Sequence, residues 1–231
     1  MNLNLKGKTA VVCGSTQGLG YASAVELALL GANIVLMARN EEKLQSTLKE
    51  LDQSQGQQHQ YLVADFSDVN NVIAAINAFV DAGGVAHILV NNTGGPAAGP
   101  AINAASNDFV RAFNNHLLCN HELVKALVPG MKESGFGRII NVISTSVKQP
   151  IPGLGVSNTI RAAVASWSKT LAGELASFGI TVNNVLPGFT NTARAAYVVD
   201  NKARATGKSS KEILTALESE IPLGRMGEPH E

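Results

Sequence analysis

Three glycines near the start of the chain, Gly14, Gly18 and Gly20, have the spacing of loops that bind dinucleotide phosphates. They separate an apolar run, residues 9–12, from an Ala- and Leu-rich helical pattern, residues 19–30. Glycine permits a tight turn and lets the backbone approach phosphate oxygens without an intervening Cβ. The helix that follows offers free N–H groups and partial positive charge to the phosphates. Glycines alone could serve turn geometry, but strand, turn and helix together predict a nicotinamide dinucleotide site.

The residues after the second apolar run indicate which dinucleotide is preferred. A carboxylate there would bind the adenosine ribose hydroxyls and favour NAD(H), whereas this chain has Ala38-Arg39-Asn40. No acid repels a 2′-phosphate, and the guanidinium of Arg39 can pair with one. We therefore expect NADP(H), with NAD(H) the weaker ligand, although Arg39 could be an ordinary solvated cation. Asp65 could accept a hydrogen bond from the adenine amino group, or cap the next helix.

Short apolar runs alternate with helical patterns along the chain, and these elements must position the candidate residues. Continuous apolar strands are buried on both faces, and their alternation with helices predicts βαβ crossovers. We expect an α/β fold, a single doubly wound Rossmann-type domain over residues 1–231, with a parallel sheet and helices on both faces. The expected strands are 9–12, 33–37, 61–63, 87–90, 138–143 and 181–186, and the expected helices are 19–30, 41–51, 69–82, 107–131, 158–178 and 210–220.

Two segments are expected to depart from regular structure. Pro129 should break the helix over 107–131 near its end, because proline lacks a backbone N–H. Residues 190–211 are polar and rich in small side chains, so we expect a mobile segment over the site.

Further motifs make the chain resemble the short-chain dehydrogenase/reductase family, especially its 3-oxoacyl-acyl-carrier-protein reductase-like members. The resemblance runs from Leu5 to the last residue. It is carried by the glycine turn, Asp65, Asn91-Asn92-Thr93-Gly94, Gly137-Arg138-Ile139-Ile140-Asn141, Ser144, Val182-Asn183-Asn184-Val185-Leu186-Pro187-Gly188 and Pro222-Leu223-Gly224-Arg225-Met226-Gly227. It implies cofactor contacts by Gly14, Ser15, Gln17, Gly18, Leu19, Gly20, Arg39, Asp65, Phe66, Asn92, Gly94, Arg161, Pro187, Gly188 and Thr192.

The resemblance also implies catalytic positions. The family uses a serine that polarises the carbonyl and a tyrosine that donates the proton. A lysine lowers the tyrosine pKa and holds the nicotinamide ribose, and an asparagine supports a proton-relay water. The serine position falls on Ser144, the tyrosine position on Ser157, the lysine position on Arg161 and the asparagine position on His116.

A shift of the alignment by a few residues does not restore the missing tyrosine and lysine. No tyrosine lies between Tyr61 and Tyr197, and no lysine lies between Lys148 and Lys169. An aliphatic hydroxyl is a much weaker acid than a phenol, so the replacement serine should be a poor proton donor.

Three sources of the proton remain open. His116 titrates near neutrality, and we expect it to face the site from the long helix. Tyr197 is the one phenol near the segment expected over the site, and water could be relayed through Ser157. Structural roles for His116 and Tyr197 are equally compatible with the sequence. Arg161 keeps a positive charge and could hold ribose hydroxyls, but it stays protonated.

Composition narrows the class of protein. Eighteen basic residues balance eighteen acidic ones, so a nucleic-acid partner is not expected. No apolar stretch is long enough to predict a membrane span, and the N-terminus lacks the apolar core of a secretory signal. The two cysteines, Cys13 and Cys119, favour a reducing, cytoplasmic location. The histidines show no paired spacing, so no metal site is expected.

These observations favour an NADP(H)-dependent oxidoreductase that acts on a small carbonyl or alcohol substrate, similar to the 3-oxoacyl reductases but with an altered proton path. The alternative is a catalytically impaired nucleotide-binding sensor or interaction protein, and elimination or epimerisation also stays open. The resemblance implies a homodimer or tetramer through the helices over 107–131 and 158–178. It also implies a C-terminal helix and a last strand beyond Glu231, whose absence would leave a sheet edge exposed.

Overall fold

A parallel sheet of six strands forms the centre of the computed structural model, which describes residues 3–231. The spatial order of the strands is β3-β2-β1-β4-β5-β6, and every neighbouring pair is parallel. This is the doubly wound order, in which successive strands are added toward one edge up to β3 and toward the other edge from β4 onward. The strands are β1 (Thr9–Cys13), β2 (Asn33–Ala38), β3 (Gln60–Val63), β4 (Ile88–Asn91), β5 (Gly137–Val142) and β6 (Ile180–Val185). The predicted fold class and sheet are confirmed.

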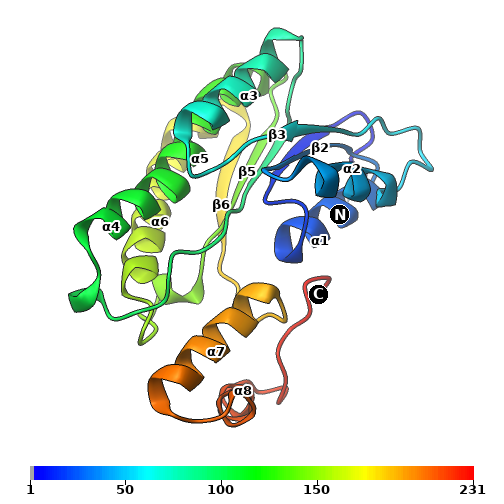
Figure 1. Cartoon of the computed structure of the whole chain (residues 1–231). Helices are drawn as coiled ribbons and strands as arrows, with labels where there is room; N and C mark the ends of the chain where they lie inside the picture. The colour runs from blue at the N-terminus through cyan, green and yellow to red at the C-terminus, as the bar shows by residue number, and fades with distance from the viewer. Residues whose placement is uncertain (1–2) are drawn as a thin grey trace.

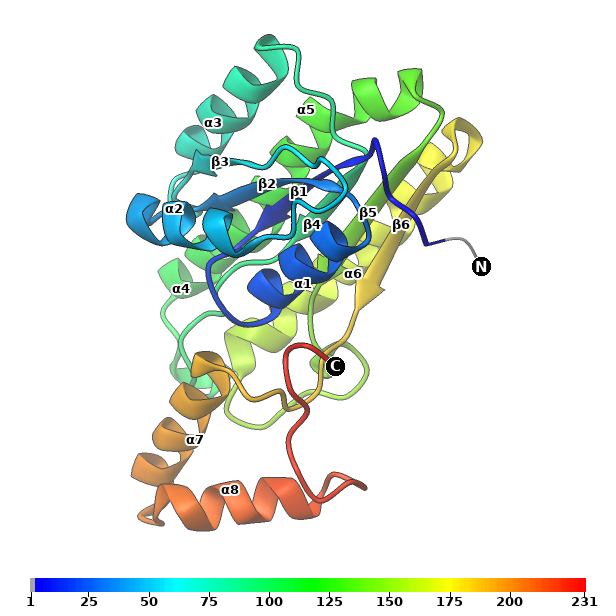
Figure 2. The ribbon, with the colours of Figure 1, turned by 90° about the vertical axis from the view of Figure 1, so that its right-hand side faces the viewer.

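Helices cover both faces of the sheet (Figure 1). One face carries α1 (Gly18–Leu29) and α2 (Glu41–Glu50), and the other carries α3 (Val69–Asp81), α4 (Ser106–Phe113), α5 (Cys119–Glu133) and α6 (Gly155–Leu175). A separate lobe made of α7 (Ala193–Thr206) and α8 (Ser210–Ser219) lies beyond the ends of the strands (Figure 2). None of the helices in residues 3–231 is long and apolar enough to cross a membrane.

Both faces of the sheet are buried, as the continuous apolar strands require. Successive strand residues point to opposite faces, so Ile34 packs with α1 and α2 while Val35 packs with α3 and α5. Ala24 and Ala28 form the buried stripe of α1 and allow this helix to lie close to the sheet. Apolar side chains thus form one buried cluster on each face of the sheet. The two clusters hold the strands in place and so fix the strand ends that carry the candidate residues.

The expected break at Pro129 is wrong, because α5 continues through this residue to Glu133. Pro129 lies on the exposed face of the helix, whereas Leu127 and Met131 are buried. A proline inside a helix costs about 3 kcal/mol. Burial of Leu127 and Met131 stabilises the helix by about 1.5–3 kcal/mol for each side chain, which offsets this cost.

The helix expected over 107–131 is divided by a π-helical turn, Asn114–Leu118, between α4 and α5. Residues 190–211, for which no regular element was expected, mostly form α7. Thr192 caps this helix, since its Oγ1 accepts a hydrogen bond from the Ala195 N–H at 3.3 Å. The apolar face of α7 packs against α8 through Val199 and Ile213.

Candidate functional site

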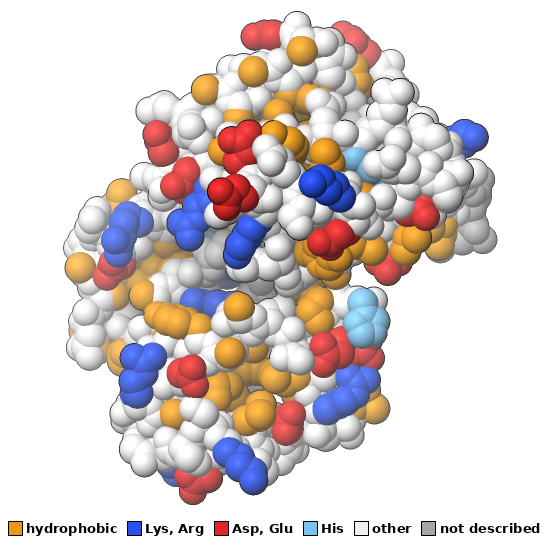
Figure 3. All heavy atoms as spheres, turned by 45° about the vertical axis from the view of Figure 1, so that its right-hand side comes forward, with side chains coloured by type: hydrophobic (Ala, Val, Ile, Leu, Met, Phe, Trp, Pro, Cys, Tyr) orange, Lys and Arg blue, Asp and Glu red, His pale blue; other side chains and the backbone are white. Residues whose placement is uncertain are grey.

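A cavity of about 750 Å³ lies at the carboxyl ends of the strands, between the sheet and α7. The space-filling view shows the surface hollowed between the sheet-bearing body and the α7–α8 lobe (Figure 3). In doubly wound sheets, ligands bind at this end, where the strand order reverses. Each strand contributes a residue to the wall just after its end: Gly14, Arg39, Asp65, Asn92, Ser144 and Pro187.

The glycine turn after β1 is packed as tightly as a phosphate-binding turn needs to be. Gly14 and Gly18 have backbone φ angles of +59° and +56°, which residues other than glycine rarely adopt. A Cβ on Gly20 would lie 2.3 Å from the Gly14 carbonyl oxygen, so α1 starts in direct contact with the turn. Asn92 supports the turn from β4 by donating to the Cys13 carbonyl at 3.3 Å. The exposed backbone here fits the diphosphate of a dinucleotide.

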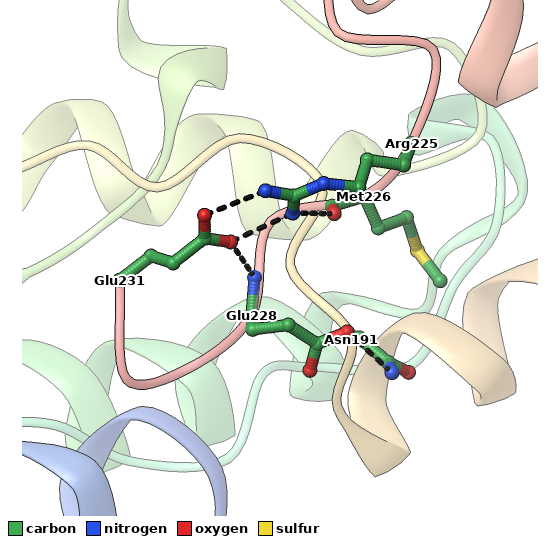
Figure 4. Close-up of polar contacts among 5 residues, drawn as sticks. All are labelled: Asn191, Arg225, Met226, Glu228 and Glu231. Atoms are coloured by element: carbon green, nitrogen blue, oxygen red, sulfur yellow. Dashed lines mark hydrogen bonds and ion pairs between the residues drawn. The ribbon is translucent and has the colours of Figure 1, made fainter.

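The start of α7 faces the glycine turn across the cavity. A Cβ on Gly18 would lie 3.3 Å from Cγ2 of Thr192. The C-terminal segment holds the loop before α7 in place, since Asn191 donates to the Glu228 carboxylate at 3.0 Å (Figure 4). Glu231 pairs with Arg225 at 2.7 Å and also accepts from the Glu228 N–H. These contacts bring the chain end back to the rim of the cavity.

One end of the cavity matches the adenosine part of a dinucleotide. Arg39 and Asp65 both line this end, after β2 and β3. The Asp65 carboxylate accepts a hydrogen bond from the Ser67 N–H at 2.9 Å. The bonds from Ser67, followed by the charge of Arg39, hold the pKa of Asp65 below its usual range. The carboxylate is therefore an ionised acceptor near neutral pH, and Arg39 is free of any ion pair within residues 3–231.

Three of the proposed catalytic residues meet at the opposite end of the same cavity. Ser144, Ser157 and Arg161 all line its wall. Oγ of Ser144 accepts from the Ser146 N–H at 3.1 Å, which leaves the hydroxyl proton free to be donated to a ligand. Ser157 and Arg161 are one turn apart on α6, and Nη1 of Arg161 donates to the Val142 carbonyl at 2.8 Å.

His116 does not face the cavity as expected. Its side chain is 2% exposed within the π-helical turn, and its neighbour Asn115 lines the wall instead. Burial, followed by the charges of Arg161 and Arg194, holds the pKa of His116 well below its usual value. The imidazole is therefore neutral near pH 7, and its Nδ1 has no hydrogen-bond partner within residues 3–231. π-Helical turns often mark functional sites, but neither the hydrophobic periodicity nor the residue types predicted this one.

Other sequence-predicted residues divide into two groups. Gln17, Leu19, Phe66, Gly94, Gly188 and Thr192 lie on the cavity wall. Ser15 and Gly20 do not line it, because Oγ of Ser15 is buried and accepts from the Met37 N–H, and Gly20 packs on the turn. Tyr197 is also outside the wall and is 41% exposed.

Sequence reasoning missed Arg194, which lines the cavity from the first turn of α7. Its Nη2 donates to the Pro96 carbonyl at 2.7 Å, so the side chain reaches the loop after β4. Its guanidinium lies 5.2 Å from the centre of the Tyr197 ring. The available signal was an arginine two positions after Thr192, in the segment expected over the site.

Comparisons with known proteins agree with this fold. The short chain dehydrogenase family profile matches residues 8–203. The 3-oxoacyl-acyl-carrier-protein reductase FabG of Vibrio harveyi is 31% identical over 231 residues, which is 99% of this chain and 88% of the relative. FabG of Pseudomonas aeruginosa is 32% identical and is covered to the same extent, 99% and 88%. The chain belongs to the short-chain dehydrogenase family.

Solved structures show the same architecture. L-sorbose reductase from Gluconobacter frateurii, solved with NADPH and L-sorbose, has a TM-score of 0.89 and 30% identity, covering 100% of this chain and 88% of that one. YwfH, an NADPH-dependent reductase involved in bacilysin biosynthesis, has a TM-score of 0.89 and 28% identity, covering 96% and 87%.

We predict that Gly20→Ala lowers the free energy of unfolding by about 1–3 kcal/mol, because the new Cβ forces the turn and α1 apart. Urea unfolding followed by circular dichroism measures the change. Gly173→Ala is the matched control, since Gly173 is inside α6 with open space at its Cβ and should gain about 0.5–1 kcal/mol. Equal effects of the two substitutions would contradict the close packing of the turn.

Proposed function

We propose that this protein is an NADP(H)-dependent oxidoreductase that reduces a small carbonyl substrate, similar to the 3-oxoacyl reductases, through a proton path that lacks tyrosine. One observation carries the proposal. A single cavity joins the glycine turn and Arg39 at one end to Ser144, Ser157 and Arg161 at the other. The NADPH complex of L-sorbose reductase, the NADPH-dependent reductase YwfH and the FabG relatives support the same assignment.

The cofactor contacts follow from the wall of this cavity. Backbone N–H groups of the glycine turn and the start of α1 would hold the diphosphate. Arg39 would pair with the 2′-phosphate, and Asp65 would accept from the adenine amino group. Pro187, Gly188 and Thr192 would hold the nicotinamide half from the loop after β6. When bound, NADPH supplies a hydride to the carbonyl carbon and becomes NADP⁺, while the carbonyl oxygen gains a proton to give the alcohol.

Ser144 is the residue that we assign to the carbonyl oxygen. Its hydroxyl proton is free to donate, and it stabilises negative charge as that charge develops on the oxygen. Arg161 lies on the same wall and adds a fixed positive charge, which also favours the alkoxide-like state. Some of its four remaining N–H groups can hold the hydroxyls of the nicotinamide ribose, as the family's lysine does.

Water relayed through Ser157 is the proton source that the positions favour. Ser157 lines the cavity, whereas His116 and Tyr197 do not. A neutral His116 has no imidazolium proton to give near pH 7. Proton delivery is then slower than in enzymes that use a phenol, and the hydride step is sustained by electrostatic stabilisation of the oxygen.

We predict that NADPH binds much more tightly than NADH and that Arg39→Ala removes this preference. Loss of the charge-assisted bonds to the 2′-phosphate should raise the NADPH Kd by about 10- to 100-fold and leave the NADH Kd unchanged. Titration followed by cofactor fluorescence measures both constants. Lys43→Ala, an exposed cation on α2, is the control. An unchanged NADPH Kd in Arg39→Ala would rule out this role for Arg39.

Ser144→Ala should lower kcat of carbonyl reduction by about 10²- to 10³-fold, because a donor to the developing oxyanion is lost. The NADPH Kd should stay unchanged, since the serine contacts the substrate oxygen. Steady-state NADPH oxidation and a fluorescence titration give the two values. A kcat equal to that of the unmodified protein would show that Ser144 takes no part in the reaction.

The pH profile of kcat/KM distinguishes the proton sources. Burial, assisted by the charge of Arg194, lowers the pKa of Arg161 to about 10, so its positive charge is present at neutral pH and is lost as pH rises through that value. We expect a flat profile from about pH 7 to 9 and a decline above it. A decline that sets in at acidic pH would instead identify His116 as the acid, because its imidazolium loses its proton at a pKa well below the usual value.

A nucleotide-binding protein without reductase activity is the second candidate, and the replacement of the phenol favours it. In that case NADPH binds, but no carbonyl or alcohol panel gives turnover above background. A Ser144-dependent activity would eliminate this candidate.

We further propose that the protein is a homodimer or tetramer in which the α4–α5 and α6 helices pair across subunits. Val110 and Phe113 on α4 are 55% and 39% exposed, which supports a partner for this surface. Light scattering after size-exclusion chromatography tests the proposal, and a monomer would overturn it.

A further inference from the structure

The catalytic end of the cavity carries positive charge without a carboxylate partner. The charged residues on the cavity wall are Arg39, Asp65, Arg161 and Arg194. Asp65 belongs to the adenosine end, where the charge of Arg39 contributes to lowering its pKa. No ion pair within residues 3–231 includes Arg161 or Arg194. Two guanidinium groups therefore face one region that contains no acidic side chain on its wall.

Most donors of both arginines are available to a ligand. A guanidinium has five N–H donors, and hydrogen bonds within residues 3–231 use one donor of each group. Arg161 donates to the Val142 carbonyl, and Arg194 donates to the Pro96 carbonyl. These single bonds anchor the side chains on two sides of the cavity, from α6 and from α7.

The two charges are close enough to act on each other and on their surroundings. The positive charge of Arg194 contributes to lowering the pKa of Arg161, and both charges contribute to lowering the pKa of His116. Keeping two like charges partly out of water is costly unless an anion offsets them. Among the described residues, 3–231, no acidic side chain lines this part of the cavity.

We infer that the substrate carries a carboxylate, which Arg161 and Arg194 hold while its carbonyl oxygen meets Ser144. Arginine matches a carboxylate with paired N–H donors, which fixes orientation as well as charge. The inference rests on the proposed function and narrows its substrate class to keto acids.

The cofactor diphosphate is the other anion that could enter this cavity, but the positions favour the substrate. The backbone of the glycine turn already provides donors for the diphosphate. Arg161 is anchored to Val142, two residues before Ser144, so it lies at the carbonyl end. Arg194 crosses from α7 to the loop after β4 and closes the same end.

The test compares keto acids with their neutral esters. Acetoacetate and benzoylformate are each paired with their neutral esters, ethyl acetoacetate and methyl benzoylformate, and NADPH oxidation is followed. We expect kcat/KM to be higher for each keto acid than for its ester. Arg194→Gln should raise the KM of the keto acid by about 10- to 100-fold, change the KM of the ester much less and leave the NADPH Kd unchanged. Arg194→Lys should recover part of the loss.

A direct binding measurement gives a second readout. Isothermal titration of the NADP⁺-loaded protein with benzoylformate should show saturable binding that Arg194→Gln weakens. Arg204→Gln, which changes an arginine on α7 that does not line the cavity, is the matched control. The titration decides the question even if neither ketone is turned over.

The outcomes separate the inference from the proposed function. Esters that react as well as their acids, or benzoylformate that does not bind the loaded protein, overturn the carboxylate inference while NADPH binding stands. An equal rise in the NADPH Kd of Arg194→Gln overturns it in favour of the cofactor diphosphate. Failure of NADPH to bind the unmodified protein overturns the proposed function itself.

Discussion

Close contact between the glycine turn and the start of α1 determines what the rest of the site can do. A Cβ on Gly20 would lie 2.3 Å from the Gly14 carbonyl oxygen, so only glycine lets the helix start at this point. The contact aims the N-terminus of α1 at the cavity, where its N–H groups can meet phosphate oxygens. Asn92 and Ser15 fix the turn against β4 and β2, and thereby connect it to the sheet on both sides.

The parallel sheet then collects the other groups at the same edge. Since all six strands run in one direction, their carboxyl ends place Arg39, Asp65, Ser144 and Pro187 around one cavity. The α7–α8 lobe closes the open side and adds Arg194. In the proposed reaction, which lacks a phenol, the electrostatic field of this cavity would be the main aid to carbonyl reduction. A positive site favours the developing alkoxide, and an anionic substrate would offset the cost of keeping that charge in place.

Much of this arrangement followed from the sequence, because it depends on local chemistry. The glycine spacing, the residues after the second apolar run and the alternation of elements predicted the sheet and the adenosine end of the site. The family resemblance added Ser144, Ser157 and Arg161, which also line the cavity. The position of His116 did not follow, because a π-helical turn rotates the helix locally and neither periodicity nor residue type marks it. Pro129 was misleading because burial of Leu127 and Met131 outweighs its local preference. The position of Arg194 did not follow either, because it depends on where the polar segment that contains it folds over the sheet. Tertiary contacts to α8 and to the C-terminal residues set that place.

The central claim is that this cavity carries out hydride transfer without the tyrosine and lysine of its family. Single-turnover reduction of a ketone with NADPH deuterated at the transferable C4 position tests the claim most directly. The predicted result is one deuterium on the carbinol carbon of the product, with a normal primary isotope effect on the rate. Bound cofactor with no transfer of deuterium across a panel of keto acids and ketones would contradict it, and would identify the protein as a nucleotide-binding member of a catalytic family.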